Sequence, residues 1–212
     1  MMNRRTYPVT IWDEYFRQYL IPIYVAVAMF AVGILFGVLA IETLTPADIL
    51  SLSTYVRQFV GMETSTPTYA GLFQPALVSN LKVLGLFYIL GVSVAGMPLV
   101  LVTLFFRGFV LGFTVAFLIS SLHWEGFALA VIAVVLQNLF IVPALLIVSG
   151  VALGFSWQLI ATKGGSARSS LIQKFGGFTT LVVLMALVIV VGTAVEAYGS
   201  PFLIHIAGQW GI

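Results

Sequence analysis

Charged residues are scarce in this sequence. Asp, Glu, Lys and Arg together make up 8% of the 212 residues, whereas a soluble globular domain carries about 25%. Hydrophobic residues make up 61% and the mean hydropathy is +1.13. A folded chain of this size still exposes a large surface. The composition therefore excludes a soluble enzyme and a nucleic-acid-binding domain, and it predicts that lipid covers most of the protein.

Residues that carry chemistry are also missing. The chain has no cysteine, which excludes disulfides, thiolate catalysis and thiolate metal ligation. His123 and His205 are too few for a histidine metal site. The sequence also lacks the His-Glu-x-x-His, P-loop and Gly-x-Ser-x-Gly motifs. We therefore expect a non-enzymatic protein with no catalytic residue, no cofactor, no metal ion and no nucleic acid partner.

Long apolar runs are abundant, and five of them are candidate membrane spans. A bilayer core about 30 Å thick needs roughly 20 residues of helix. The third run is short for one crossing. The fourth is too long for one crossing, and dividing it at Pro143 would give six spans. Pro98 and Pro143 each lie inside a run, where proline kinks a helix. The five runs are 20–41, 83–106, 109–122, 127–160 and 175–195.

The distribution of basic residues favours five spans over six. With a cytoplasmic N-terminus, seven of the nine cations fall inside, including Arg107 in a tight turn between the second and third runs, where it reaches headgroups. Arg57 and Lys82 are then outside, together with five of the seven acids. Six spans would export the basic loop 161–174, against the positive-inside rule. We predict a cytoplasmic N-terminus and a C-terminus outside.

The flanking segments are expected to belong with the spans to a single membrane domain over residues 1–212. Apolar and charged residues at helical spacing predict a cytoplasmic amphipathic helix in 1–19. The outer loop 42–81 is expected to hold helices, one of which begins at Thr45-Pro46-Ala47-Asp48, a capping pattern. The tail 196–212 is also expected outside. One apolar face of the helix that begins at Thr45 is a candidate partner-docking surface: Ile49, Leu52, Val56 and Phe59.

Three polar residues are expected to be buried in or beside the spans. Gln137 and Asn138 precede Pro143 at membrane depth, where polar groups face another helix or a water-filled cavity. They either satisfy carbonyls that Pro143 leaves free or line a path for a solute or ion. Glu196 closes the fifth run, either as a solvated helix-end carboxylate or packed on a neighbouring helix with Lys82 as its donor.

Three pairs of glycines spaced four residues apart predict close helix packing, because small residues let helix backbones approach in a membrane. The sequence leaves open whether each pair packs within one chain or joins two chains in a homodimer. The pairs are Gly33 and Gly37, Gly108 and Gly112, and Gly150 and Gly154.

In their order and spacing, these features resemble the stage II sporulation protein M family, over nearly the whole chain. The likeness rests on the five spans, the amphipathic N-terminus, the notch of Gly33 and Gly37, and Asn80 just before the second span. It also includes Arg107-Gly108-Phe109-Val110-Leu111-Gly112-Phe113, the block from Gln137-Asn138 to Pro143-Ala144, and Glu196-Ala197-Tyr198.

The resemblance implies a non-enzymatic membrane subunit of the engulfment machinery of endospore-forming bacteria. Such proteins lie in the mother-cell membrane at the sporulation septum. They recruit and hold two partners, stage II sporulation proteins D and P, which remodel peptidoglycan outside the membrane. The implied role is a membrane scaffold. The alternative is a membrane channel or carrier with a polar site around Gln137 and Asn138.

Overall fold

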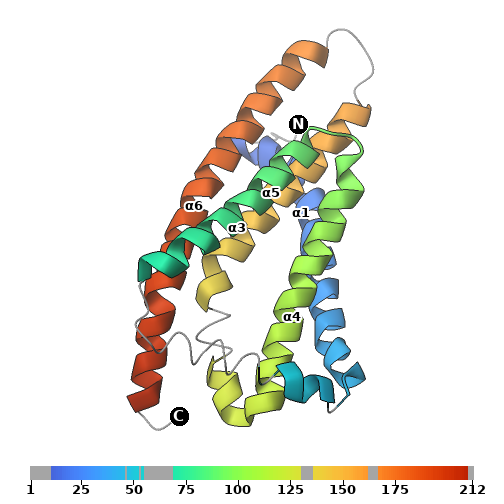
Figure 1. The fold of residues 1–212 in the computed structure, drawn as a ribbon. Coiled ribbons are helices and arrows are strands. Elements are labelled where there is room, and N and C mark those ends of the chain that lie inside the picture. Colours follow the sequence, from blue (N-terminus) through green and yellow to red (C-terminus); the bar gives the residue numbers. More distant parts are fainter. Residues whose placement is uncertain are drawn as a thin grey trace, which may run out of the picture.

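The computed structural model is a bundle of long helices (Figure 1). It describes residues 11–45, 47–52, 54, 69–129, 136–161 and 167–209, and these ranges contain no β-strand. A short helical segment begins after Thr45. The other elements are α1 (Ile11–Ala40), the 3₁₀ helix η1 (Ile41–Thr43), α3 (Tyr69–Gly91), α4 (Gly96–Leu129), α5 (Leu136–Ala161) and α6 (Ala167–Gln209).

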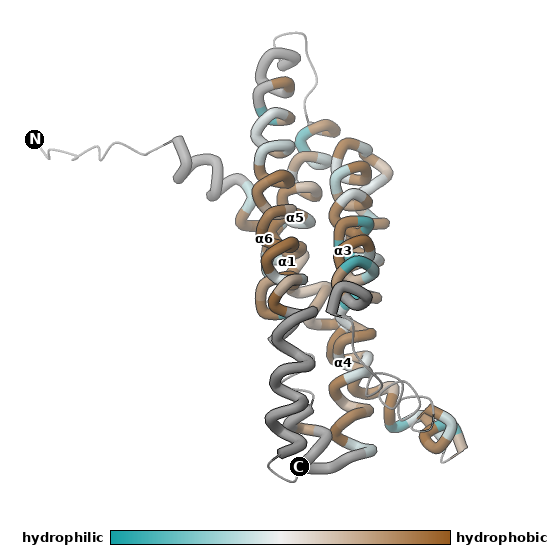
Figure 2. The backbone as a smooth tube through the Cα atoms, turned by 60° about the vertical axis from the view of Figure 1, so that its left-hand side comes forward, coloured by the Kyte–Doolittle hydropathy of each residue, from teal (hydrophilic) through white to brown (hydrophobic). Residues whose placement is uncertain are grey.

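Each of the five long helices is long and apolar enough to cross a membrane. This result confirms the predicted all-α, multi-pass membrane bundle. Hydrophobic residues cover most of the described helices on every side (Figure 2), as expected where lipid replaces water around the bundle. The spans are Tyr19–Thr43, Phe73–Gly91, Gly96–Ser121, Asn138–Ile160 and Lys174–Val195.

The second and third spans do not meet where the sequence pattern placed them. We expected one span over 83–106 and a turn at Arg107. Instead α3 ends at Gly91 and α4 begins at Gly96, so the predicted second span is divided and its second half belongs to α4. The expected third span, which was too short to cross a bilayer, becomes the continuation of a helix of normal length.

Glycine and proline explain the true position of this turn. Backbone N–H groups of Ser93 and Gly96 donate to the carbonyls of Leu90 and Ser93, which closes the turn. A Cβ on Gly96 would collide with the Leu90 carbonyl. Pro98 lies in the first turn of α4, where a missing N–H removes no helical hydrogen bond. Pro98 therefore begins a helix, and the predicted kink within a span is wrong.

The long fourth run is divided between two helices. Its first residues close α4, which ends at Leu129, and α5 begins at Leu136. The fourth span therefore starts at Asn138, which removes the excess length of the predicted segment 127–160. α5 continues as one helix through Pro143, so the described residues contain five spans and the division at Pro143 is not used.

Helices that we expected beside the membrane are continuous with the spans. α1 begins at Ile11 and runs directly into the first span, so the helix expected in 1–19 is no separate element in its described part. α3 begins at Tyr69, which shortens the expected outer loop 42–81. α6 takes in part of the basic loop and most of the tail.

The α5 helix occupies the centre of the bundle. In an apolar 18-residue stretch of its span 67% of the residues are buried, against 22% or less in the corresponding stretch of each of the other four spans. α5 packs against α1, α3 and α6 and makes its smallest contact with α4, and Figure 1 shows it between α6 and α1. The largest core cluster includes five buried α5 side chains, namely Ile141, Ala144, Leu145, Val148 and Leu153.

Candidate functional site

Arg107 lies near the middle of the α4 span. It is about 16 Å along the helix from Gly96 at 1.5 Å per residue, and the span continues to Ser121. A basic residue at this depth is rare and faces the bundle interior or a water-filled cavity. The prediction that Arg107 sits in a cytoplasmic turn and reaches lipid headgroups is therefore wrong. It followed from the misplaced boundary between the second and third spans.

Hydrogen bonds connect Arg107 to α3 and, through α3, to α6. Arg107 Nη2 donates to Asn80 Oδ1 at 2.9 Å, and Asn80 Nδ2 donates to Thr193 Oγ1 at 3.5 Å. Asn80 and Thr193 are both buried. Two neutral side chains thus orient one guanidinium. The sequence analysis did not identify Asn80 as a site residue because it was placed outside the second span, whereas that span begins at Phe73.

Arg107 lines a cleft of about 480 Å³ between α4 and α5. The predicted polar residue Asn138 lines the same cleft from α5, so the fold brings together two residues that are 31 positions apart in the sequence. Thr103 and Thr114 add polar groups from α4. The remaining lining residues are apolar: Phe30, Phe106, Val110, Leu111 and Val142.

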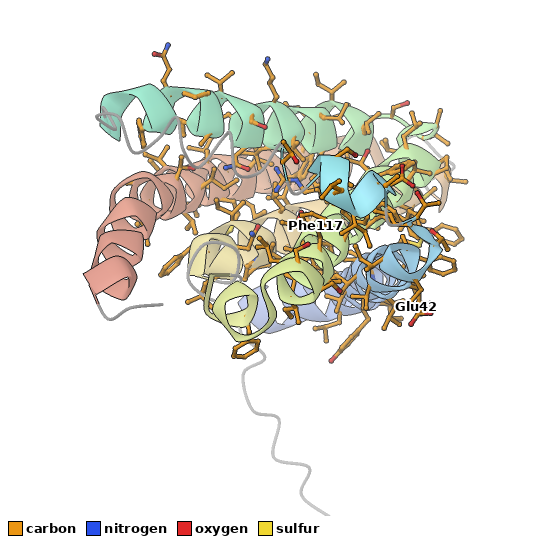
Figure 3. The ribbon with its side chains drawn as sticks, turned by 60° about the horizontal axis from the view of Figure 1, so that its bottom comes forward. Glu42 and Phe117 are labelled. Carbon is orange, nitrogen blue, oxygen red and sulfur yellow. The ribbon has the colours of Figure 1, made fainter. Side chains whose placement is uncertain are left out.

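The cleft carries positive charge at membrane depth. The five spans contain a single acidic residue, Glu42, which lies at the end of the first span and points away from the bundle (Figure 3). The neutral amide oxygen of Asn80 helps to orient the Arg107 guanidinium. Arginine keeps its proton in proteins, so the charge persists at every physiological pH.

Four glycines hold α4 tightly against α1 within the same chain. The two helices form the most extensive helix pair of the bundle. A Cβ added to any of the four would meet backbone atoms of the facing helix at less than 3 Å. This contact fixes the rotation of α4 about its axis, which turns Arg107 toward the cleft. The four are Gly33, Gly37, Gly108 and Gly112.

The third glycine pair also packs within the chain. Gly150 on α5 lies against Ile23, and Gly154 lies against Tyr19 and Pro22, all on α1. The question that the sequence left open is therefore answered for these six glycines, because their close contacts are between helices of one chain. A homodimer stays a prediction, and it would need another surface.

The turn between α3 and α4 is held by Ser156 of α5. The Ser156 hydroxyl is buried and lies 2.7 Å from the Gly91 carbonyl and 3.0 Å from the Ser93 carbonyl. Gly91 also approaches Ala152 so closely that a Cβ there would lie 2.8 Å from the Ala152 Cβ. These contacts connect the central helix to the start of α4 and so to the helix that carries Arg107.

An aromatic ladder continues along α4 from the glycine contact. Four phenylalanines spaced four residues apart stack with ring centroids 6.2 to 6.4 Å apart. The last of them, Phe117, is buried among the helices (Figure 3). This ladder was not predicted from the sequence, although the spacing of its phenylalanines is regular there. Its members are Phe105, Phe109, Phe113 and Phe117.

Two of the three predicted polar residues have side chains outside the described part of the structure. These are Gln137 and Glu196, so the expected pairing of Glu196 with Lys82 stays a prediction. Lys82 itself lies within the α3 span and is exposed, not at the outer end of a span as expected. Among the described residues, no three His, Cys, Asp or Glu side chains gather into a group that could hold a metal ion.

The predicted helix start at Thr45 is present. Thr45 N and Oγ1 donate to Asp48 Oδ2 at 3.1 and 2.6 Å, and Asp48 N donates to Thr45 Oγ1 at 3.3 Å. The hydrogen bonds from the side chain and then the backbone of Thr45 hold the pKa of Asp48 below its ordinary value. Of the candidate docking residues, Ile49 and Leu52 are half-buried, whereas Val56 and Phe59 lie outside the described residues.

A family model described as Stage II sporulation protein M matches residues 26–201. No curated protein matches the chain, and no solved structure does. The fold defines a multi-pass helical membrane protein. Since the match covers 176 of the 212 residues, the chain belongs to the stage II sporulation protein M family. It is a membrane protein related to sporulation.

Proposed function

We propose that this chain is a non-enzymatic membrane scaffold of the peptidoglycan-remodelling complex that acts in engulfment. In this proposal it recruits stage II sporulation proteins D and P to the sporulation septum and anchors them there, while those partners carry out the chemistry. Membership of the family supports the proposal. The chain's own contribution is a rigid multi-span anchor with helical surfaces beyond the bilayer.

The capped helix after Thr45 is the observation that carries this proposal. The reciprocal hydrogen bonds of Thr45 and Asp48 begin a helix immediately after the first span. Leu50 on this helix is 70% exposed, and an exposed leucine on an ordered helix next to the membrane is suited to contact a membrane-proximal segment of a partner protein.

Two long helices extend past their spans at the end of the bundle where α1 also ends. α6 continues from Val195 to Gln209, about 21 Å of helix at 1.5 Å per residue. α4 continues from Ser121 to Leu129. α1, α4 and α6 contain the first, third and fifth spans, and therefore cross the membrane in the same direction. The extensions of α4 and α6 and the Thr45 helix, which follows α1, consequently lie on the same side of the membrane.

The distribution of charges supports an exterior location of this side. Removing Arg107 and Lys82 from the count of flanking charges leaves Arg57 as the sole cation on the Thr45 side, against six on the side of the N-terminus. By the positive-inside rule, this imbalance supports a cytoplasmic N-terminus and a C-terminus outside. In a mother cell, this orientation directs the helical extensions toward the septal peptidoglycan.

The test is a charge placed on the exposed face of the Thr45 helix. Leu50→Glu should lower co-purification of proteins D and P from sporulating cells about tenfold or more, as expected when a central apolar contact is lost. Ser51→Glu is the matched control, because Ser51 is an exposed neighbour on the same helix. Both variants should insert normally. Equal recovery of the partners with Leu50→Glu and with the wild type would contradict the scaffold proposal.

The cleft supports a second candidate function, a channel or carrier. Asn138 lines this cleft together with Arg107, and buried polar groups between helices are typical of transporter sites. In that case Gln137→Leu with Asn138→Leu should abolish solute or ion flux in proteoliposomes and leave complex assembly intact. If assembly is lost instead, the two residues serve packing and this second candidate is wrong.

A further inference from the structure

We infer that the outer face of α3 binds a transmembrane helix of another protein, and that this helix carries an aspartate or glutamate which pairs with Lys82. The inference goes beyond the scaffold proposal, whose docking surface is the Thr45 helix outside the membrane. It does not rest on that proposal, because a subunit of a channel or carrier could bind a partner helix in the same way.

Lys82 lies at the centre of its span. The two ends of the α3 span, Phe73 and Gly91, are each nine residues away, which is about 14 Å along the helix at 1.5 Å per residue. A lysine near the end of a span extends its ammonium group to the headgroups, whereas a charge deep in a span is costly and normally pairs with another group. Lys82 is as far from both ends as this span allows.

The side chain of Lys82 is on the outside of the bundle. It is exposed, and no residue of the described ranges forms a hydrogen bond or an ion pair with it. α3 packs on α4, α5 and α6, and Figure 3 shows it along one edge of the bundle, with side chains that point away from the other helices. The surroundings of the protein, and not its own interior, must therefore accommodate this charge.

The residues around Lys82 form a narrow stripe that suits a second helix. Val78, Lys82, Gly85 and Ile89 follow the spacing i, i+4, i+7 and i+11, which places all four on one side of α3. Val78 and Ile89 are 43% and 68% exposed. This Lys82 stripe is therefore apolar on either side of the ammonium group, so that a helix packed along it meets one charge at mid-membrane.

Gly85 indicates that the other helix approaches closely. Glycine destabilises the interior of a helix relative to alanine. At Gly33 and Gly37 an added Cβ would collide with backbone of a facing helix, but at Gly85 it would meet nothing within 4 Å. Packing within the chain does not account for Gly85, whereas a partner helix on the Lys82 stripe would use the missing side chain to come near the backbone of α3.

The charge determines the chemistry of the occupant. A second copy bound through the same face under two-fold symmetry would place one Lys82 beside the other. The five spans of this chain contain a single acidic residue, Glu42, which lies at the end of the first span. Phospholipid headgroups lie beyond both ends of the span. A carboxylate on the span of a different protein reaches the ammonium group at its own depth and compensates it.

The experiment measures how a synthetic transmembrane peptide binds to the full chain in lipid nanodiscs. The peptide contains about 20 leucine and alanine residues and one central glutamate. Binding is followed by energy transfer to a dye on Val94→Cys, which lies in the exposed turn after α3 and is the sole cysteine of that variant. Lys82→Leu should weaken binding about 3- to 30-fold, as expected for polar contacts between membrane helices, and Lys82→Arg should bind as the wild type does.

Two variants separate a specific contact from a general effect of polarity. Gln74→Leu is the matched control, since it removes a polar side chain that is exposed on the same helix but lies near the end of the span. It should bind as the wild type does. Gly85→Leu keeps the charge and fills the open space on the stripe, so it should weaken binding while the protein folds normally.

Several results would overturn the inference. One is equal binding of the glutamate peptide and of a peptide with central leucine, and another is unchanged binding in Lys82→Leu, as expected if Lys82 only contacts lipid. A loss of binding in Glu196→Gln equal to that in Lys82→Leu would mean that Lys82 pairs within the chain. Self-association of the chain that Lys82→Leu abolishes would make a second copy the occupant.

A charge exchange tests the same contact in sporulating cells. A photoreactive amino acid at Val78 should give a discrete cross-linked product, whereas one at Leu187, which is 60% exposed on α6, should not. Lys82→Glu should abolish the product, and replacing the carboxylate of the captured span by lysine should restore it. A captured span without Asp or Glu, the absence of a product, or a failed restoration would contradict the inference. The outcome is independent of Leu50→Glu, which tests the docking surface outside the membrane.

Discussion

Replacing Gly37 by alanine tests whether the contact between α1 and α4 holds the bundle together. A Cβ at Gly37 would lie 2.7 Å from the backbone nitrogen of Phe113 and closer still to the Phe109 carbonyl, whereas ordinary contacts begin at 3.4 Å. The obstacle is backbone and cannot rotate away. To bring the closest contact, with the Phe109 carbonyl, to an ordinary distance, the two helices must separate locally by about 1 Å or more.

The magnitude follows from two opposing effects. Overpacking of this kind costs about 1–3 kcal/mol, while alanine gains about 0.5–1 kcal/mol over glycine inside a helix. We expect a net loss of about 1–2 kcal/mol in the free energy of unfolding. For a chain of this length that corresponds to a melting temperature lower by about 2–8 °C.

The assay is thermal unfolding of the purified protein in a mild detergent, followed by tryptophan fluorescence. Gly85→Ala on α3 and Gly176→Ala on α6 are matched controls, because a Cβ at either position meets nothing within 4 Å. Both controls should melt at the wild-type temperature or above it. If Gly37→Ala melts with them, close packing of α1 on α4 is not what stabilises the bundle, and the reasoning fails.

Three further predictions concern the turn, the capped helix and the orientation. Ser156→Ala removes the hydroxyl donor to the Gly91 carbonyl and should cost about 1–2 kcal/mol of unfolding free energy; unchanged thermal stability would contradict its role. Thr45→Ala should raise the titration midpoint of Asp48, measured by NMR, because its hydrogen bonds lower that pKa. The pKa of Asp48 is lower in the folded protein than in the unfolded protein. The ionised carboxylate therefore stabilises the helix start at pH values above the unfolded pKa, and this stabilisation is lost as the pH falls through the folded pKa. An equal titration midpoint in the wild type and in Thr45→Ala would refute this role of Thr45. Leu50→Cys should react with an impermeant maleimide added outside intact cells, whereas reaction only after lysis would reverse the predicted orientation.

The sequence was sufficient to predict structural features that depend on residues close together in the chain. The helix start at Thr45 could be predicted because Thr45 and Asp48 lie three residues apart and satisfy one another's hydrogen bonds. The number of spans could be predicted because the lengths of the apolar runs allowed five or six crossings and the positive-inside rule favoured five. The glycine pairs could be predicted as contact points because a missing side chain is visible in the sequence.

The ends of the helices and their buried faces were harder to predict from the sequence, because a helix surrounded by lipid does not show the usual hydrophobic periodicity. In water, hydrophobic periodicity separates the buried face of a helix from its exposed face. In a membrane both faces of a helix are apolar, so no periodicity in the sequence marks the turn between α3 and α4. Charge was used instead, and Arg107 was assigned to a turn because a cation inside a span is rare.

Composition and local spacing by themselves determined that this chain is an all-helical membrane bundle with five crossings, a capped helix after the first span and three close glycine contacts. Only the tertiary structure decided which helices those glycines join, that α5 is the central helix, and that Arg107, Asn80, Thr193 and Asn138 gather around one polar cluster and cleft. The reason is that these residues come from four helices. Their proximity depends on how each helix is rotated and how deeply it sits, which backbone contacts such as that of Gly108 with Phe30 set between helices far apart in the sequence.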